Sequence, residues 1–239
     1  MAMPVVIDIA DKNINDSVFE EIFNYLRYID EKFSTYKKNS EIEKINRNEI
    51  GHELYSDDMK KVLTLADQTK QETNGYFDIR FNGKLDPSGL VKGFAIYNAA
   101  NMLKNKGYKN FYIDIAGDIE LSGVSSDGNK WSVGIENPFD RSKVIKVLAL
   151  TDRGIATSGN YIRGDHIWNN KDNKINNSVV SITVIGENVY ESDRFATAAF
   201  AMGEEGINFM ENLPGFEAYM VLENKNAIFT SGFENYVIK

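Results

Sequence analysis

The chain has 239 residues, of which 42% are hydrophobic, so it can bury one substantial core or two small intertwined lobes. Its 35 acidic and 27 basic residues lack the basic excess of a nucleic-acid binder. It has no cysteine and only two histidines, which excludes thiolate chemistry and polyhistidine metal sites. Any metal is therefore expected to be a hard cation held by oxygen ligands, with magnesium the first choice.

The first half of the chain carries strand and helix signals in alternation. Residues 4–9 have the composition of a strand, and residues 15–33 have helical apolar spacing after a cap at Asp16. A second helix is expected over residues 57–72, followed by a turn at 73–75. A third is expected over residues 93–106, ending at Gly107.

The second half is dominated by short β-rich runs. Strands are expected over 111–115, 119–124, 131–136, 143–150 and 178–186, and a closing hairpin over 218–222 and 227–230. A last helix is expected over 192–202, resuming at 204–212, and the stretch 169–177, rich in lysine and asparagine, is expected to form a mobile loop. The pattern predicts an α+β fold in which helices pack against a mixed sheet.

The segment LDPSGLVKG at residues 85–93 is the most informative stretch. Asp86 and Gly89 belong to a tight entry, and Lys92 lies at the start of the apolar-periodic helix that follows. Free backbone N–H groups at a helix start favour anions, and a lysine there adds a point charge suited to phosphate. The segment indicates a nucleotide-type ligand, although Asp86 alone could be a turn cap and Lys92 a solvated cation.

A second chemical signal comes from Asp193 and Thr197. They are four residues apart, so on a helix both oxygens project from one face and can hold a single cation. The alternative is that Asp193 is an acidic residue in the first helical turn that interacts with the helix dipole, followed by an ordinary threonine.

Five ordered blocks resemble the FAD:protein FMN transferase family, the ApbE-type flavin transferases, over almost the whole chain. They are FSTY at 33–36 with SEI at 40–42, GYFD at 75–78, the segment 85–119 with its DPSGLVKG and IAGDI motifs, ATSG at 156–159, and SDRFATA at 192–198. The resemblance implies a single domain over 1–239 with two intertwined lobes and the flavin nucleotide between them. It also implies a Mg²⁺-dependent enzyme that cleaves FAD, attaches FMN through a phosphoester to a threonine or serine hydroxyl of a target flavoprotein, and releases AMP.

The resemblance also assigns roles to individual residues. Asp193, Thr197 and the backbone oxygen of Gly89 match the metal ligands, and Asp193 and His166 match positions with a catalytic role. Taken alone, Tyr36 and Phe77 are more typical of core or turn anchors than of a ligand pocket, and His166 could equally be a loop histidine with satisfied hydrogen bonds. The positions that match FAD contacts are Met1, Tyr36, Tyr76, Phe77, Asp78, Asp86, Lys92 and Ile167.

The chain departs from the family pattern at Ala2 and Met3, and again at residues 169–173, where an Asp-Pro and a Thr-Gly pair are missing. These departures leave two alternatives open: an FAD pyrophosphatase that gives FMN and AMP, and a non-catalytic FAD-binding module. The expected partners are FAD and an acceptor flavoprotein, without nucleic acid, and a homodimer is left open. No apolar run is long enough to cross a membrane, so the expected location is the cytoplasm, or an exported or lipid-anchored form if a leader has been removed. The general base remains unassigned.

Overall fold

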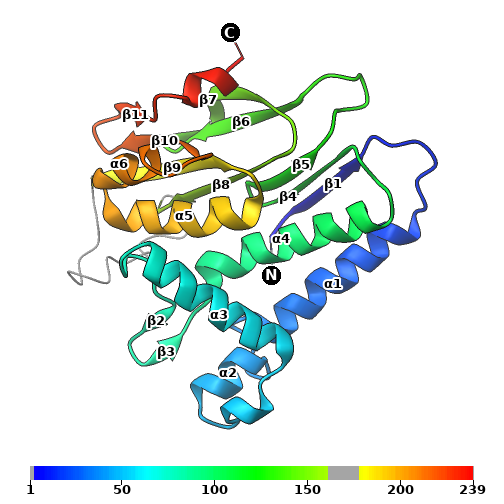
Figure 1. Ribbon diagram of the computed structural model, residues 1–239, viewed down its shortest axis with the longest axis vertical. Coiled ribbons are helices and arrows are strands. Elements are labelled where there is room, and N and C mark those ends of the chain that lie inside the picture. Colours follow the sequence, from blue (N-terminus) through cyan, green and yellow to red (C-terminus); the bar gives the residue numbers. More distant parts are fainter. Residues whose placement is uncertain (1–2, 161–177, 239) are drawn as a thin grey trace.

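The computed structural model describes residues 3–160 and 178–238 and is built around one large sheet (Figure 1). The sheet has seven strands in the order β1-β4-β5-β8-β9-β10-β11. The α+β class is confirmed, but each described pair of neighbouring strands is antiparallel, so the sheet is not mixed. The strands are β1 (Val5–Ile9), β4 (Phe111–Ile115), β5 (Asp118–Ser122), β8 (Arg153–Gly159), β9 (Val179–Gly186), β10 (Glu217–Leu222) and β11 (Ala227–Phe229).

Helices cover one face of this sheet. Helices α4 and α5 pack side by side on the strands, α6 lies beyond α5, and α1 and α3 pack outside α4 (Figure 1). The helices are α1 (Ser17–Phe33), α2 (Glu41–Asn46), α3 (Asp57–Glu72), α4 (Ser88–Asn105), α5 (Val189–Met202) and α6 (Glu205–Glu211), with short 3₁₀ turns η1 (His52–Leu54) and η2 (Phe233–Tyr236).

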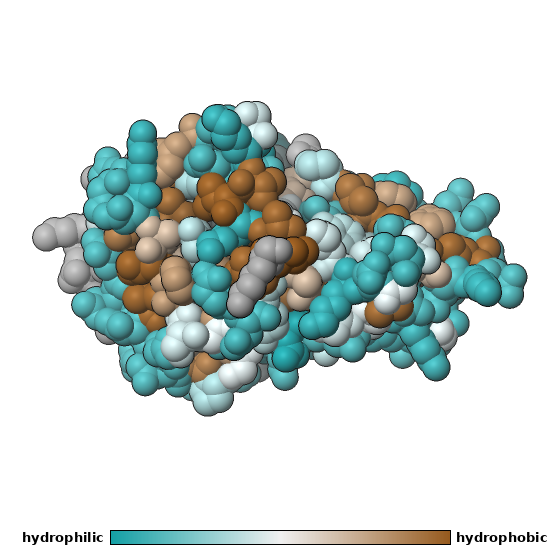
Figure 2. Space-filling view, turned by 90° about the horizontal axis from the view of Figure 1, so that it is seen from above, coloured by the Kyte–Doolittle hydropathy of each residue, from teal (hydrophilic) through white to brown (hydrophobic). Residues whose placement is uncertain are grey.

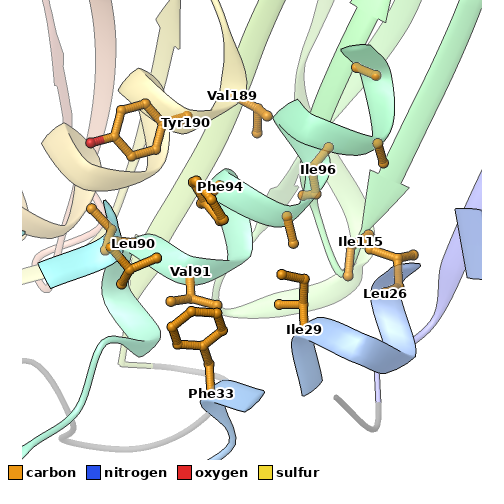
Figure 3. Packing of buried hydrophobic residues seen from close by; sticks show 14 of the residues in the cluster. Leu26, Ile29, Phe33, Leu90, Val91, Phe94, Ile96, Ile115, Val189 and Tyr190 are labelled. Atoms are coloured by element: carbon orange, nitrogen blue, oxygen red, sulfur yellow. The ribbon is translucent and has the colours of Figure 1, made fainter. Parts of the chain in front are cut away.

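The largest hydrophobic core surrounds α4. Leu26, Ile29 and Phe33 of α1 and Leu90 and Phe94 of α4 converge there, together with side chains from β4 and α5 (Figure 3). Full burial of a side chain of this size stabilises the fold by roughly 1.5–3 kcal/mol. Helix α4 is therefore held from several sides, and the segment that precedes it is anchored to the core.

The opposite face of the sheet is covered by a long hairpin, β6 (Trp131–Asn137) and β7 (Asp140–Leu150). Trp131, Val133 and Leu148 of the hairpin pack on Ile119 and Leu121 of β5 in a second core. Figure 2 shows the molecule from above relative to Figure 1, on the side that carries the β6–β7 hairpin. Hydrophobic residues there interrupt a largely hydrophilic surface.

Most expected elements are present, with shifted boundaries. Helix α4 begins at Ser88 rather than at 93, because the Pro87 carbonyl already accepts the N–H groups of Leu90 and Val91. Helix α5 begins at Val189 rather than at 192, because the Asn188 side chain accepts the N–H of Glu191 and caps the helix there.

Helix α2, strand β8 and a small hairpin formed by β2 (Arg80–Phe81) and β3 (Lys84–Leu85) were not expected from the sequence. All three contribute to the site described below. Within residues 3–160 and 178–238, no helix is long and apolar enough to cross a membrane.

Candidate active site

A cavity of about 1280 Å³ lies between the helical part of the chain and the sheet. One wall comes from α2, the segment 76–89 and the start of α4, and the other from β4, β5, β8 and the β6–β7 hairpin. This volume exceeds the 300–1,000 Å³ typical of sites for drug-sized ligands, so the cavity has room for a dinucleotide. The predicted residues that line it are Tyr76, Phe77, Asp78, Asp86, Gly89, Lys92, Asp193 and Thr197.

The three expected metal ligands converge at one end of this cavity. The Thr197 hydroxyl lies 3.2 Å from the carbonyl oxygen of Gly89 and 3.3 Å from Oγ of Ser158. Asp193 lies one turn before Thr197 on α5 and lines the same cavity. A carboxylate, a hydroxyl and a carbonyl are the hard oxygen donors that Mg²⁺ prefers, and phosphates of a ligand could supply further donors.

Within the residues that the structure describes, no group of three or more acidic or histidine side chains could hold a metal ion. The site of Gly89, Asp193 and Thr197 does not need such a group, since only one of its three donors is a carboxylate. Because α5 begins at Val189, Asp193 lies in the second turn of the helix rather than in the first. The helix-dipole alternative for Asp193 therefore loses its structural basis, since that effect falls off within the first turn.

Close packing of α4 against α5 sets the geometry of this site. The N–H of Gly93 donates to Oδ2 of Asp193 at 2.8 Å, and Asp193 is only 4% exposed. A Cβ atom on Gly93 would lie 2.7 Å from Cβ of Asp193 and 2.8 Å from the carbonyl oxygen of Val189. The absence of a side chain at Gly93 therefore allows α4 and α5 to pack closely, and the hydrogen bond fixes the orientation of the Asp193 carboxylate.

Lys92 reaches the cavity from the second turn of α4 and is paired on its inner side. Its Nζ lies 2.7 Å from Oδ2 of Asp118, a carboxylate at the start of β5 that is 1% exposed. Oδ2 of Asp118 is thus paired with the Lys92 ammonium group, and Oδ1 accepts the N–H of Thr157 at 3.2 Å. Burial raises the pKa of Asp118, and the positive charge of Lys92 opposes that shift.

The turn before Asp118 brings backbone to the cavity wall. Ala116 and Gly117 connect β4 and β5 with positive φ angles of 53° and 90°, and both line the cavity. Asp114 supports the turn by accepting the N–H of Gly117 at 2.8 Å. A left-handed alanine costs roughly 1–2 kcal/mol, so this tight turn is held by its surroundings.

Asp86 and Asp78 combine structural contacts with positions on the cavity. Asp86 accepts the N–H of Ser88 at 3.0 Å, which is the turn-capping role left open by the sequence. Asp78 pairs with Lys70 at 2.5 Å and accepts the N–H of Arg80 at 2.9 Å. Both carboxylates are thus oriented by local contacts while they face the cavity.

The aromatic residues are divided between the cavity and solvent. Phe77 is 3% exposed and joins the core while it also lines the cavity, and Tyr76 lines it as well. Tyr36 is 98% exposed and does not line the cavity. Tyr36 is not part of this pocket wall, because α1 ends at Phe33 and the following turn directs Tyr36 to solvent, and its expected contact with FAD stays a prediction.

Three expected site residues, Met1, His166 and Ile167, lie outside the described residues, as does the expected loop 169–177. The roles that the resemblance assigns to them stay predictions.

Two residues of the site were not singled out from the sequence. Asn46 of α2 accepts the N–H of Leu85 at 2.8 Å and donates to its carbonyl at 3.0 Å, as a neighbouring strand would. Asp118 is the aspartate of the IAGDI motif. An acidic residue next to Ile119 at the start of a buried strand is a signal that could have marked it, because aspartate is rarely buried without a partner.

The fold and the cavity define an α+β protein with a nucleotide-sized site and an oxygen-rich corner for a cation. The model of the ApbE family matches residues 1–84 and 80–220. The chain therefore belongs to the ApbE family.

Individual relatives agree with that assignment. A FAD:protein FMN transferase of Vibrio cholerae is 35% identical over 131 residues, which cover 51% of this chain and 39% of that protein. One of Haemophilus influenzae is 23% identical over an alignment that covers 90% of this chain and 81% of that protein. The structure of the flavin transferase ApbE from Vibrio cholerae superimposes with a TM-score of 0.83 at 24% identity, covering 99% of this chain and 96% of that one. This last likeness concerns the fold alone.

Proposed function

We propose that the chain is a Mg²⁺-dependent FAD:protein FMN transferase, formed as a single unit over residues 1–239. The observation that carries the proposal is the convergence of Gly89, Asp193 and Thr197 in a nucleotide-sized cavity beside Lys92. Membership of the ApbE family and curated relatives with this activity in their names support it.

In the proposed reaction, the hydroxyl oxygen of a threonine or serine on the acceptor attacks the phosphorus of the FMN half of FAD. A new P–O bond forms, the bond to the bridging oxygen of the pyrophosphate breaks, and AMP leaves with that oxygen. The proton of the hydroxyl passes to solvent or to a base outside the residues assigned here. Atoms and charge balance without an oxidant or reductant.

Residues of the chain would bind and orient the pyrophosphate. Lys92 offers a positive charge to its oxygens, whereas the N–H groups of Ser88, Leu90 and Val91 at the start of α4 already donate to Asp86 and Pro87. Mg²⁺ held by Asp193, Thr197 and the Gly89 carbonyl would polarise the phosphoryl group and neutralise charge on the departing phosphate. The deep position of Asp193 excludes water from one side of this corner.

The test incubates the protein with FAD, Mg²⁺ and a flavoprotein that carries an acceptor threonine, and measures AMP release together with in-gel flavin fluorescence of the acceptor. We expect both products, and loss of both by a factor of about 10² or more in Asp193→Ala, since one group that stabilises transition-state charge contributes on this order. An Asn105→Ala variant at the exposed end of α4 is the matched control.

Other outcomes contradict the proposal in different ways. AMP without labelled acceptor indicates an FAD pyrophosphatase, and FAD binding with neither product indicates a binding module. Unchanged activity in Asp193→Ala would show that the cation site is elsewhere. We further propose an acceptor flavoprotein as the partner and the cytoplasm as the location. The mass of the same protein preparation in solution tests whether it forms a homodimer.

A further inference from the structure

A pair of opposite charges lies behind the wall of the cavity, where Lys92 and Asp118 meet. Asp118 does not itself line the cavity, whereas Lys92 does. The side chain of Lys92 is 15% exposed and that of Asp118 is 1% exposed, so the pair is almost dry on one side and meets the ligand space on the other.

The carboxylate of Asp118 joins three elements. Its own backbone belongs to β5, its Oδ2 holds Lys92 of α4 at 2.7 Å, and its Oδ1 accepts the N–H of Thr157 on β8 at 3.2 Å. Thr157 also lines the cavity. The Lys92 ammonium group is thus held by a carboxylate that contacts two neighbouring strands, and its position is not left to solvent.

A second pair between the same helix and the same strand provides a comparison. Lys104 of α4 lies 3.4 Å from Glu120 of β5, and the Lys104 side chain is 43% exposed. Neither residue lines the cavity. A buried carboxylate on β5 is therefore found twice, but only the one at Asp118 holds a lysine at the ligand space.

Stability alone does not account for the Lys92–Asp118 pair. Desolvation of two charges commonly exceeds their attraction, so a well-packed apolar pair is often as stable or more stable. Lysine also has many side-chain rotamers, and holding it in one position costs conformational entropy. A lysine that must contact a phosphate in one geometry binds it better if its side chain is already fixed, because the loss of side-chain entropy then occurs on folding and not on ligand binding.

We propose that Asp118 is a positioning residue that fixes the ammonium group of Lys92 for contact with the pyrophosphate of FAD. The inference rests on the proposed function for the identity of the ligand. Asp118 acts through Lys92 and does not touch the ligand. Its negative charge also offsets that of Lys92, so affinity for the anion is lowered while the geometry is kept.

The test is a double-mutant cycle with wild-type protein, Asp118→Asn, Lys92→Met and the double variant. The asparagine keeps an oxygen for the Thr157 N–H and replaces the charged Oδ2 that faces Lys92 with an uncharged NH₂ group. FAD binding is measured by fluorescence titration without Mg²⁺ at low and moderate salt, and transfer kinetics are measured with Mg²⁺. Thermal melts establish that each variant is folded.

In the Lys92 background, Asp118→Asn is expected to tighten FAD binding about tenfold at low salt, because Lys92 is then uncompensated, with a steeper dependence on salt. The kcat is expected to fall about tenfold as the ammonium group loses its fixed position. In the Lys92→Met background, Asp118→Asn is expected to change FAD binding by less than about twofold. Glu120→Gln, the matched control, is expected to leave FAD binding within about twofold because it lies outside the cavity.

Equal effects of Asp118→Asn in both backgrounds would overturn the proposal, and so would no effect in either. Lys92→Met leaves the buried Asp118 carboxylate unpaired and could fail to fold. In that case the double variant is compared with Asp118→Asn. The proposal then requires that the double variant bind FAD at least about tenfold more weakly than Asp118→Asn. If the wild type releases no AMP and labels no acceptor, only the transferase function is refuted. The double-mutant cycle of FAD binding still measures the coupling between Asp118 and Lys92. Absence of FAD binding in the wild type overturns both.

Discussion

Gly93 is the position where a single added methyl group should affect both stability and the cation site. Its missing side chain allows α4 and α5 to approach, and an alanine Cβ would lie 2.8 Å from the carbonyl oxygen of Val189 and 2.7 Å from Cβ of Asp193. The first of these neighbours is backbone and cannot rotate away. Gly93→Ala must therefore separate the two helices or distort one of them.

The magnitude follows from three contributions. Overpacking costs about 1–3 kcal/mol, and weakening the hydrogen bond from the Gly93 N–H to the buried Asp193 carboxylate costs about 1.5–3 kcal/mol. Alanine returns about 1 kcal/mol through its higher helix propensity. The expected net loss is about 1.5–5 kcal/mol, which corresponds to a fall in Tm of roughly 3–20 °C in a chain of this size.

The assay is urea unfolding of wild type, Gly93→Ala and Asn105→Ala, followed by circular dichroism, together with AMP release from FAD. Asn105→Ala is a substitution to alanine at the exposed end of the same helix and should stay within about 0.5 kcal/mol of wild type. Gly93→Ala should lose stability and activity together. Wild-type stability and activity in Gly93→Ala would refute the argument that the two helices meet at Gly93 without room for a side chain.

Two further predictions concern residues around the site. Burial raises the pKa of Glu120, which caps α5 through the Val189 N–H, from an ordinary 4.5 to about 7. Between pH 4.5 and 7 the folded state holds a proton that the unfolded state has released, so the free energy of unfolding should fall by about 3 kcal/mol as pH rises through this window. Glu120→Gln should flatten this slope in urea midpoints taken at pH 5 and 7.5, and an unchanged slope would contradict the burial argument. Asn46→Ala removes both hydrogen bonds to Leu85 and should cost about 1–3 kcal/mol and raise the KM for FAD, measured by unfolding and AMP release; an unchanged KM would show that α2 does not support the ligand segment.

The sequence by itself determined much of the fold and predicted the residues that we propose as cation ligands. Helical periodicity predicted α1 and α3, because each buries one regularly spaced set of side chains, and apolar runs predicted α4 and most of the sheet, since α4, β9 and β10 are buried on more than one face. The four-residue spacing of Asp193 and Thr197 on α5 fixed their common face for the same local reason. Short elements without a complete period, such as α2 and the β2–β3 hairpin, carried no such signal.

The tertiary structure decided which distant residues meet. The ion pair of Lys92 with Asp118, the clamp of Asn46 on Leu85 and the contact of Gly93 with Asp193 join residues from 26 to 100 positions apart in the chain. The exposure of Tyr36 was likewise set by the end of α1 and not by its aromatic character. Periodicity reports only the burial of one element's own face, whereas these contacts depend on how helices and strands pack against one another, and that packing is where the carboxylates, the lysine and the glycine become a site.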